Sequence, residues 1–339
     1  MPSKFPAHIP NVWNQFRKQL FAKFPKYNSS ETWFINVYGG LGDVLPVLCH
    51  LKEFRKHHGV VYLGLICRTQ LRELLSFFTE DYDFIAYLDE DFVPPNNMRV
   101  EFGPNELICP SKKYVHGGFW HDFAVSNRVP LFDWYKLGLR VPMSSKLSFP
   151  TSKILEGKNT VLNKFQNIDF GKSILLFPFT NFGPRLDSEV WESIVKTCNS
   201  SGFKVFTNVM NASSTKLSMG QKNKIETEYH PIQGSEALVL GLADLIYVAD
   251  QFYSCISGSG GIAFLLGLVE AKVKILYHDS KRPAKFFNST APDEFWTHLD
   301  MFDAVKRNLP DRDNIAEHLV DNTFLSSISE RLFCNVEKR

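Results

Sequence analysis

Residues 33–48 read WFINVYGGLGDVLPVL, and this stretch decides the fold class of the first half of the chain. The apolar run 33–38 is rich in aromatic and β-branched side chains, as buried strands are, and it ends in a glycine turn at 39–42. From Val44 onward apolar residues recur at helical spacing and predict one helix that ends near residue 58. The stretch therefore predicts a buried strand, a tight turn and a helix.

The same alternation of strands and helices continues along the chain. Apolar, β-prone runs predict further strands at 60–67, 83–88, 106–109, 173–179, 204–209, 253–257 and 273–278. Helical periodicity predicts helices near 70–78, 130–138, 190–202, 236–249, from 262 onward, and a long one over about 313–332. Such alternation is typical of parallel sheets covered by helices on both faces.

The length of 339 residues favours two domains, since a single core rarely grows that large. The chain turns polar at about 150–172, and the alternation then restarts. We therefore expect an α/β protein of two successive Rossmann-like domains with parallel sheets. The expected division is an N-terminal helix over 1–30, a first domain over 31–165, a second over 166–310, and a returning C-terminal helix over 311–339.

Composition excludes several classes of protein. Apolar residues make up 44% of the chain and charged residues 22%, which is typical of globular proteins. No apolar run approaches the roughly 18–20 residues of a membrane span, and the first residues lack a secretory signal, so we expect a cytoplasmic protein. The six cysteines are scattered singly, which indicates buried thiols rather than a zinc site. With a net charge of +2 and basic residues largely balanced by acids, we expect no nucleic-acid partner.

The N-terminal stretch is the one strongly basic segment. Five lysines and arginines precede the first acidic residue, Glu31, and aromatic and aliphatic residues recur among them at helical spacing. Such a helix, over residues 10–26, can lie on an anionic membrane surface, which would make the enzyme peripheral at the inner membrane. Alternatively, its apolar stripe packs on the body of the protein. Pro25 ends the helix in either case.

The glycine turn after the first strand is the first candidate site. Gly40 and Gly42 allow a ligand to approach the backbone, and the following helix offers its N-terminal amides to an anion. A dinucleotide-binding turn has the pattern GxGxxG, but Leu45 stands where its third glycine belongs. Asp43, in the first turn of the helix, is either a dipole-stabilised cap or a general base.

Two turns in the second half are candidates for binding a diphosphate. Thr180 and Asn181 follow a strand and can donate hydrogen bonds to phosphate oxygens, and Arg185 can neutralise the charge of a leaving diphosphate. Alternatively, this is a solvated surface loop. The turn 258–261 (GSGG) precedes a helix, and its amides are suited to binding phosphate. We expect Ser259, Gly260 and Gly261 to contribute there.

These segments resemble the bacterial lipopolysaccharide heptosyltransferases of glycosyltransferase family 9. The run 40–46 (GLGDVLP) is similar to the family's turn, in which the aspartate is the catalytic base, so the resemblance assigns that role to Asp43. The segment 177–191 is similar to the start of the family's second domain. There a threonine and a basic residue contact the donor phosphates, as Thr180 and Arg185 would here. The resemblance implies a GT-B-like fold of two facing Rossmann-like domains.

The family's last donor loop carries an aspartate and a histidine, where this chain has Ser259 and Phe264. This departure leaves the donor sugar open, with ADP-heptose as the first candidate. The family requires no divalent metal, and we expect no metal and no cofactor here. On the acceptor side we expect Gly40, Gly42 and residues of the loose middle segment to contact an acidic or phosphorylated sugar, or else to form a solvent-facing loop. The middle-segment candidates are Lys112, Lys113, His116, Trp120 and His121.

Taken together, the sequence predicts an inverting, metal-independent glycosyltransferase. It would move a sugar from a nucleotide-diphosphate donor to a glycan or glycolipid of the bacterial surface, such as the lipopolysaccharide core. Two alternatives stay open. One is a fucosyl-, hexosyl- or other transferase of the same architecture, acting on capsule or O-antigen. The other is a nucleotide- or glycan-binding protein without turnover.

Overall fold

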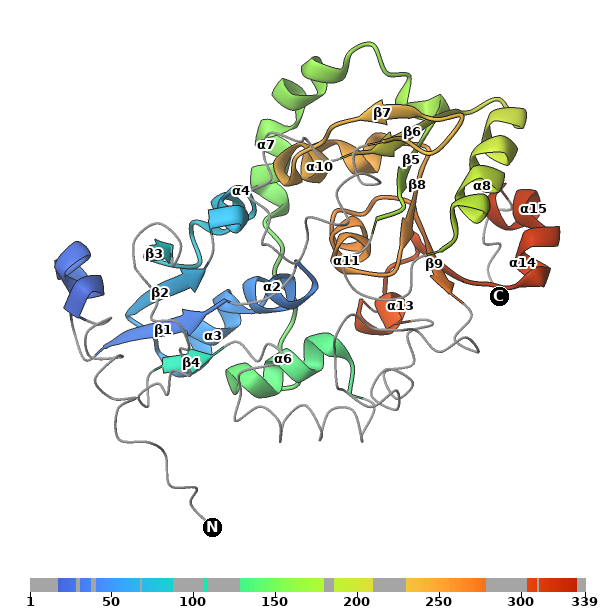
Figure 1. The fold of residues 1–339 in the computed structure, drawn as a ribbon. Helices are drawn as coiled ribbons and strands as arrows, with labels where there is room; N and C mark the ends of the chain where they lie inside the picture. Colours follow the sequence, from blue (N-terminus) through green and yellow to red (C-terminus); the bar gives the residue numbers. More distant parts are fainter. Residues whose placement is uncertain are drawn as a thin grey trace. The chain divides into compact units, whose positions relative to one another are not determined.

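The computed structural model describes residues 18–28, 31–37, 41–67, 69–87, 106–108, 129–179, 186–209, 230–278, 304–309 and 311–333. The chain consists of two compact units, Met1–Pro150 and Thr151–Arg339. Both units are built on parallel sheets with helical connections, which confirms the expected α/β class. Figure 1 shows the elements of each unit.

The sheet of the first unit has four parallel strands in the order β3-β2-β1-β4. Its strands are β1 (Thr32–Asn36), β2 (Tyr62–Cys67), β3 (Phe84–Tyr87) and β4 (Glu106–Ile108). The connecting elements are α2 (Leu41–Leu48), α3 (Leu51–His58), η2 (Thr69–Leu71), α4 (Arg72–Leu75), η3 (Ser76–Phe78) and α6 (Leu131–Leu139). The strand order reverses between β1 and β4, so the carboxyl end of β1 lies at a topological switch point.

The single helix expected over 44–58 is two helices, α2 and α3. After α2, the ring of His50 donates a hydrogen bond from Nδ1 to the carbonyl oxygen of Pro46, at 2.6 Å. The backbone amide of His50 bonds instead to Val47, at 3.0 Å, and the chain turns before α3 begins at Leu51. The expected end of the second helix is confirmed, because Gly59 closes it with a left-handed φ of 61°.

The N-terminal segment packs on the first sheet. Residues 18–23 are helical, and Pro25 follows as the first residue of η1 (Pro25–Tyr27). Leu20 is fully buried, and the rings of Phe21 and Phe24 lie 5.7 Å from Phe34 and 4.9 Å from Phe84. The described part of the apolar stripe is thus covered by the protein itself.

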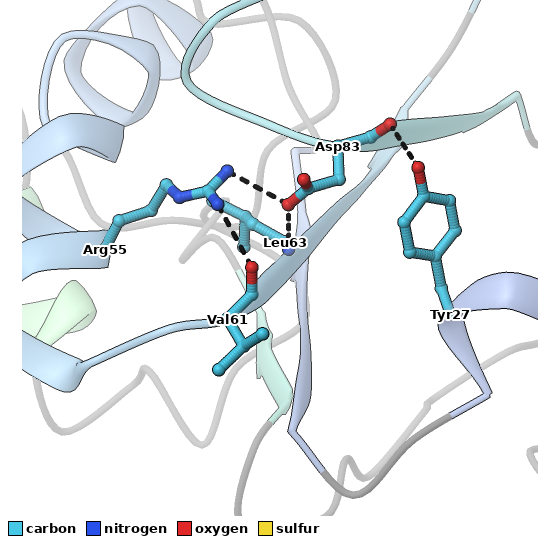
Figure 2. Close-up of polar contacts among 5 residues, drawn as sticks. All are labelled: Tyr27, Arg55, Val61, Leu63 and Asp83. Carbon is cyan, nitrogen blue, oxygen red and sulfur yellow. Dashed lines mark hydrogen bonds and ion pairs between the residues drawn. The ribbon is translucent and has the colours of Figure 1, made fainter.

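Asp83 ties together the amino-terminal ends of β2 and β3. Its carboxylate accepts hydrogen bonds from the backbone amide of Leu63, at 2.7 Å, and from Arg55, at 3.0 Å (Figure 2). Arg55 also donates to the carbonyl of Val61, and the hydroxyl of Tyr27 donates to the carbonyl of Asp83. The N-terminal segment, α3 and two strands therefore share one polar cluster.

The sheet of the second unit has six parallel strands in the order β10-β9-β8-β5-β6-β7. This is the strand order of a doubly wound dinucleotide-type fold, with its switch point between β5 and β8. The strands are β5 (Ser173–Phe177), β6 (Lys204–Asn208), β7 (Glu236–Leu238), β8 (Ser254–Gly258), β9 (Val273–His278) and β10 (Ile315–Val320).

Helices cover both faces of this sheet (Figure 1). A core cluster joins β5 and β8 to Trp191 of α8, Phe324 of α14 and Leu332 of α15, and α11 packs against β8 and β9. The helical elements are α7 (Thr151–Leu162), η4 (Asn163–Phe165), η5 (Phe170–Lys172), α8 (Ser188–Ser200), α10 (Leu242–Val248), η8 (Ala249–Gln251), α11 (Gly261–Leu268), α13 (Ala304–Asn308), α14 (Asn322–Ser326) and α15 (Ile328–Phe333).

Two of the helices predicted for the second half of the chain are not present as predicted. The stretch 313–332 is not one returning helix, because β10 pairs along its whole length with β9 and Asp321 then caps α14 by accepting from the amide of Phe324, at 2.7 Å. The stretch 236–249 is β7 followed by α10. The hydroxyl of Ser235 lies 2.6 Å from that of Thr207 and donates to the carbonyl of Ile232, and α10 begins only after Gly241.

The boundary between the two units lies before α7, at residue 150. The sequence pattern instead predicted residues 151–165 to be part of the first domain. α7 packs against α10, Lys158 of α7 forms an ion pair with Asp250 of η8, and Lys164 of η4 forms one with Asp244 of α10. These contacts place residues 151–165 with the second sheet.

Candidate functional site

The carboxyl end of β1 leads into the amino-terminal turn of α2, which carries Asp43. Leu41, Gly42 and Asp43 are half-buried, whereas the helix is fully buried from Val44 to its end. The polar turn is therefore the accessible part of this segment. Because parallel sheets bind ligands outside the carboxyl ends of their strands at a switch point, this position is suited to a functional carboxylate.

Asp43 accepts a hydrogen bond from a side chain far away in sequence. The hydroxyl of Tyr135, on α6, donates to Oδ1 of Asp43 at 2.9 Å. α6 packs against α2, and Tyr135 is fully buried with its ring next to that of Trp134, at 5.4 Å. The carboxylate is thus oriented by a rigid aromatic side chain as well as by its own helix.

His50 lies at the opposite end of α2 from Asp43. Its ring is fully buried, and because Nδ1 donates to the carbonyl of Pro46, Nε2 carries the lone pair, with no hydrogen-bond partner among the described residues. Burial lowers the pKa of His50 from its usual value. The hydrogen bond to Pro46 partly raises this pKa again, whereas the nearby charge of Lys136 lowers it further. His50 is therefore a neutral core histidine that shapes the break between α2 and α3.

In the second unit, the turn after β8 lies at the switch point of the sheet. Ser259 and Gly260 are half-buried, and α11 begins at Gly261. A helical hydrogen bond at this start runs from the amide of Ala263 to the carbonyl of Gly260, at 3.0 Å. The preceding helical amides lack acceptors within the helix, as at every helix start, and can bind an anion.

A pocket of about 490 Å³ lies where β5 ends and α8 begins. Most of its lining is apolar, and a few polar side chains stand among the apolar ones, as in many small-molecule sites. The residues that line it are Pro178, Phe179, Leu186, Ser188, Trp191, Glu192, His230, Pro231, Ile232 and Gln233. Trp191 is 2% exposed, and its indole N–H has no hydrogen-bond partner among the described residues.

Several residues expected at the site lie outside the described part of the chain. Of the sequence-predicted site residues, the structure places Gly42 and Asp43 in the first unit and Ser259, Gly260 and Gly261 in the second. Those outside the described residues are Gly40, Lys112, Lys113, His116, Trp120, His121, Thr180, Asn181 and Arg185. The described residues contain no group of three or more His, Cys, Asp or Glu side chains that could hold a metal ion.

Sequence reasoning did not find Tyr135. It lies in the segment PLFDWYKLG, whose apolar periodicity predicts an ordinary packed helix. Nothing in that segment indicates a contact with Asp43, 92 residues earlier. Tyr135 can be recognised only from the contact between α2 and α6, which the tertiary structure shows and the sequence does not.

No protein-family model matches the chain, and no curated protein matches it in sequence. Among solved structures, the chain is similar to the ADP-heptose LPS heptosyltransferase II of E. coli, with 11% identity and a TM-score of 0.47, over 89% of this chain and 97% of that one. It is also similar to a glycosyl transferase family 9 protein of Veillonella parvula, with 10% identity and a TM-score of 0.49, over 90% of this chain and 92% of that one.

A third similar structure is the E. coli heptosyltransferase WaaC with ADP, with 11% identity and a TM-score of 0.48, over 89% of this chain and 97% of that one. These likenesses concern the fold. Within the described residues, no helix is both long and apolar enough to cross a membrane.

Proposed function

We propose that this protein is an inverting, metal-independent glycosyltransferase that uses a nucleotide-diphosphate sugar, with Asp43 as its general base. One observation carries the proposal: Asp43 stands in an accessible turn at the carboxyl end of β1, where the strand order reverses, and a buried hydroxyl holds its carboxylate.

The chemistry requires one base on the acceptor side. Asp43 takes the proton from an acceptor hydroxyl while that oxygen forms a bond to C1 of the donor sugar. The bond between C1 and the diphosphate oxygen breaks on the opposite face, and its electron pair leaves with the diphosphate. The configuration at C1 inverts because attack and departure occur on opposite faces.

We assign donor binding to the second unit. The Ser259–Gly261 turn offers backbone amides at the switch point of a doubly wound sheet, which suits a diphosphate. Thr180, Asn181 and Arg185 follow β5, the other strand at that switch point, and in this proposal they bind and neutralise the leaving diphosphate. The pocket beside β5 is of a size and character to accept part of the nucleoside.

Heptose is the first candidate for the transferred sugar, with a bacterial surface glycan such as lipopolysaccharide core as the acceptor. One observation favours a different sugar, such as a fucosyl or hexosyl group. Phe264 lies on α11 and is 8% exposed, so its side chain is part of the core. At this position the chain therefore offers no polar contact to a donor. A thermal-shift panel of ADP-, GDP-, UDP- and CMP-sugars distinguishes these donors, because binding raises apparent stability.

The test of the proposed base is Asp43→Asn. We expect transfer to fall by at least ~10²-fold, as for loss of a general base, with donor binding unchanged, and activity of the parent protein to persist in excess EDTA. Asp133→Asn is a matched control, because Asp133 lies in the same unit but its carboxylate pairs with Lys136, at 2.8 Å, on its own helix. Full turnover by the Asp43 variant would refute the proposal.

Arg185→Ala tests the donor side separately. We expect weaker donor binding and slower release of the nucleoside diphosphate, because one positive charge no longer balances the leaving group. Donor binding without product under every acceptor tried would instead favour a binding protein without turnover.

A further inference from the structure

The hydrogen bond between Tyr135 and Asp43 joins two helices that are far apart in sequence, with 2.9 Å between the hydroxyl and Oδ1. We propose that Tyr135 is a positioning residue, which holds the Asp43 carboxylate in the orientation that accepts the acceptor proton. The inference rests on the proposed role of Asp43. It adds to that role the source of the carboxylate's fixed geometry.

The placement of the ring supports this role. Tyr135 is fully buried, so its two side-chain torsions are fixed by packing and its hydroxyl is held in one place. Asp43, by contrast, is half-buried in the first turn of a helix, where water and backbone amides compete for its oxygens. A fixed donor on Oδ1 selects one rotamer of the carboxylate.

The direction of the hydrogen bond matters for the chemistry. The Tyr135 hydroxyl is the donor, and Oδ1 of Asp43 is the acceptor. Hydrogen bonds to charged groups are stronger than those between neutral groups. Tyr135 therefore contributes to the orientation of the base, and because its side chain is fully buried it does so without touching the substrates.

A purely structural role makes a different prediction. In that case the carboxylate would only satisfy a buried hydroxyl, and removing the hydroxyl would affect folding but not turnover. Tyr135→Phe separates the two roles, because it keeps the buried ring and removes the oxygen. Tyr82→Phe is the matched control, since the Tyr82 hydroxyl lies in the same unit but donates to a backbone carbonyl, that of Leu75, at 3.0 Å.

The assay follows release of nucleoside diphosphate from the member of the ADP-, GDP-, UDP- and CMP-sugar panel that most stabilises the protein. For Tyr135→Phe we expect kcat to fall about tenfold, the size expected for one hydrogen bond to an ionised group, with KM for the donor changed by less than about twofold. In the Asp43→Asn background, the same substitution should change the residual rate by less than about twofold, because coupled residues are not additive.

Crystal structures supply a readout that needs no substrate. The Asp43 carboxylate should keep its orientation in Tyr82→Phe and rotate in Tyr135→Phe. If Asp43→Asn is inactive while Tyr135→Phe keeps the parental kcat and carboxylate orientation, the positioning role is overturned and the proposed base stands. If Asp43→Asn is fully active, the proposed function itself fails.

Discussion

Gly64, in the middle of β2, lies beneath the ring of Phe84, and this arrangement predicts that adding one methyl group destabilises the first unit. Gly64 pairs with Phe34 on β1 and with Phe84 on β3, and the two rings lie 5.8 Å apart. A Cβ at this position would lie 2.3 Å from Cζ of Phe84, far inside the contact distance of two carbons. Phe84 cannot easily move away, because it stacks on Tyr27 at 4.5 Å.

Gly64→Ala should therefore destabilise the first unit. In an open strand, alanine would be favoured over glycine by roughly 0.5–1 kcal/mol, but overpacking of a filled core costs about 1–3 kcal/mol. We expect a net loss of about 1 kcal/mol, which corresponds to a fall of roughly 2–4 °C in the midpoint of a unit of this size.

Scanning calorimetry of the full chain measures this midpoint directly. Gly171→Ala is the control, because a Cβ there would meet its nearest atom, a carboxylate oxygen of Asp169, at 3.6 Å, an ordinary contact. Gly64→Ala combined with Phe84→Leu should recover part of the loss. A Gly64→Ala midpoint equal to that of the parent would refute the packing argument.

Three further predictions concern charges and thiols. Asp83→Ala should lower stability by about 2 kcal/mol, measured by urea unfolding, because it leaves the amide of Leu63 and the guanidinium of Arg55 without their acceptor; an unchanged midpoint would contradict this. Burial lowers the pKa of His318 from 6.5 to about 4, and the nearby charges of Lys274 and Arg331 add to this effect. Between pH 6.5 and about 4, the unfolded chain therefore binds a proton that the folded chain does not. Stability should fall as pH drops through this window, and thermal melts of His318→Gln should show a smaller fall than the parent. Burial also raises the pKa of the Cys198 thiol to about 12. Iodoacetamide should therefore not label Cys198 at neutral pH until the protein is unfolded, as measured by mass spectrometry. Fast labelling of the folded protein would contradict the burial of this thiol.

Local sequence patterns predicted most of the strands because those strands are buried on both faces. β5 and β8 are continuous apolar or small-residue runs, and such runs are typical of parallel sheets. β10 was missed because its middle residues are only partly buried, and its polar Glu317 and His318 interrupt the apolar pattern. The strand forms because β9 offers it an unpaired edge, which is a tertiary effect.

The candidate site was predictable to the extent that it is local. A strand, a glycine turn and an acid are adjacent in sequence, so the sequence alone is enough to single out Asp43. Tyr135 could not be predicted in this way, because its contact with Asp43 depends on how α6 packs against α2. The break between α2 and α3 depends in the same way on a histidine ring that competes for one backbone carbonyl.

The aromatic side chains that follow Leu20 have a consequence for any encounter with lipid. Leu20, Phe21 and Phe24 are the described members of the apolar stripe that would face a bilayer, yet they already pack on Phe34 and Phe84. Insertion would expose the sheet's own aromatic residues to water, so lipid and sheet compete for the same three side chains. Attachment through them is therefore an exchange between two apolar surfaces, and it should become easier as the first unit is loosened by heat or by Gly64→Ala.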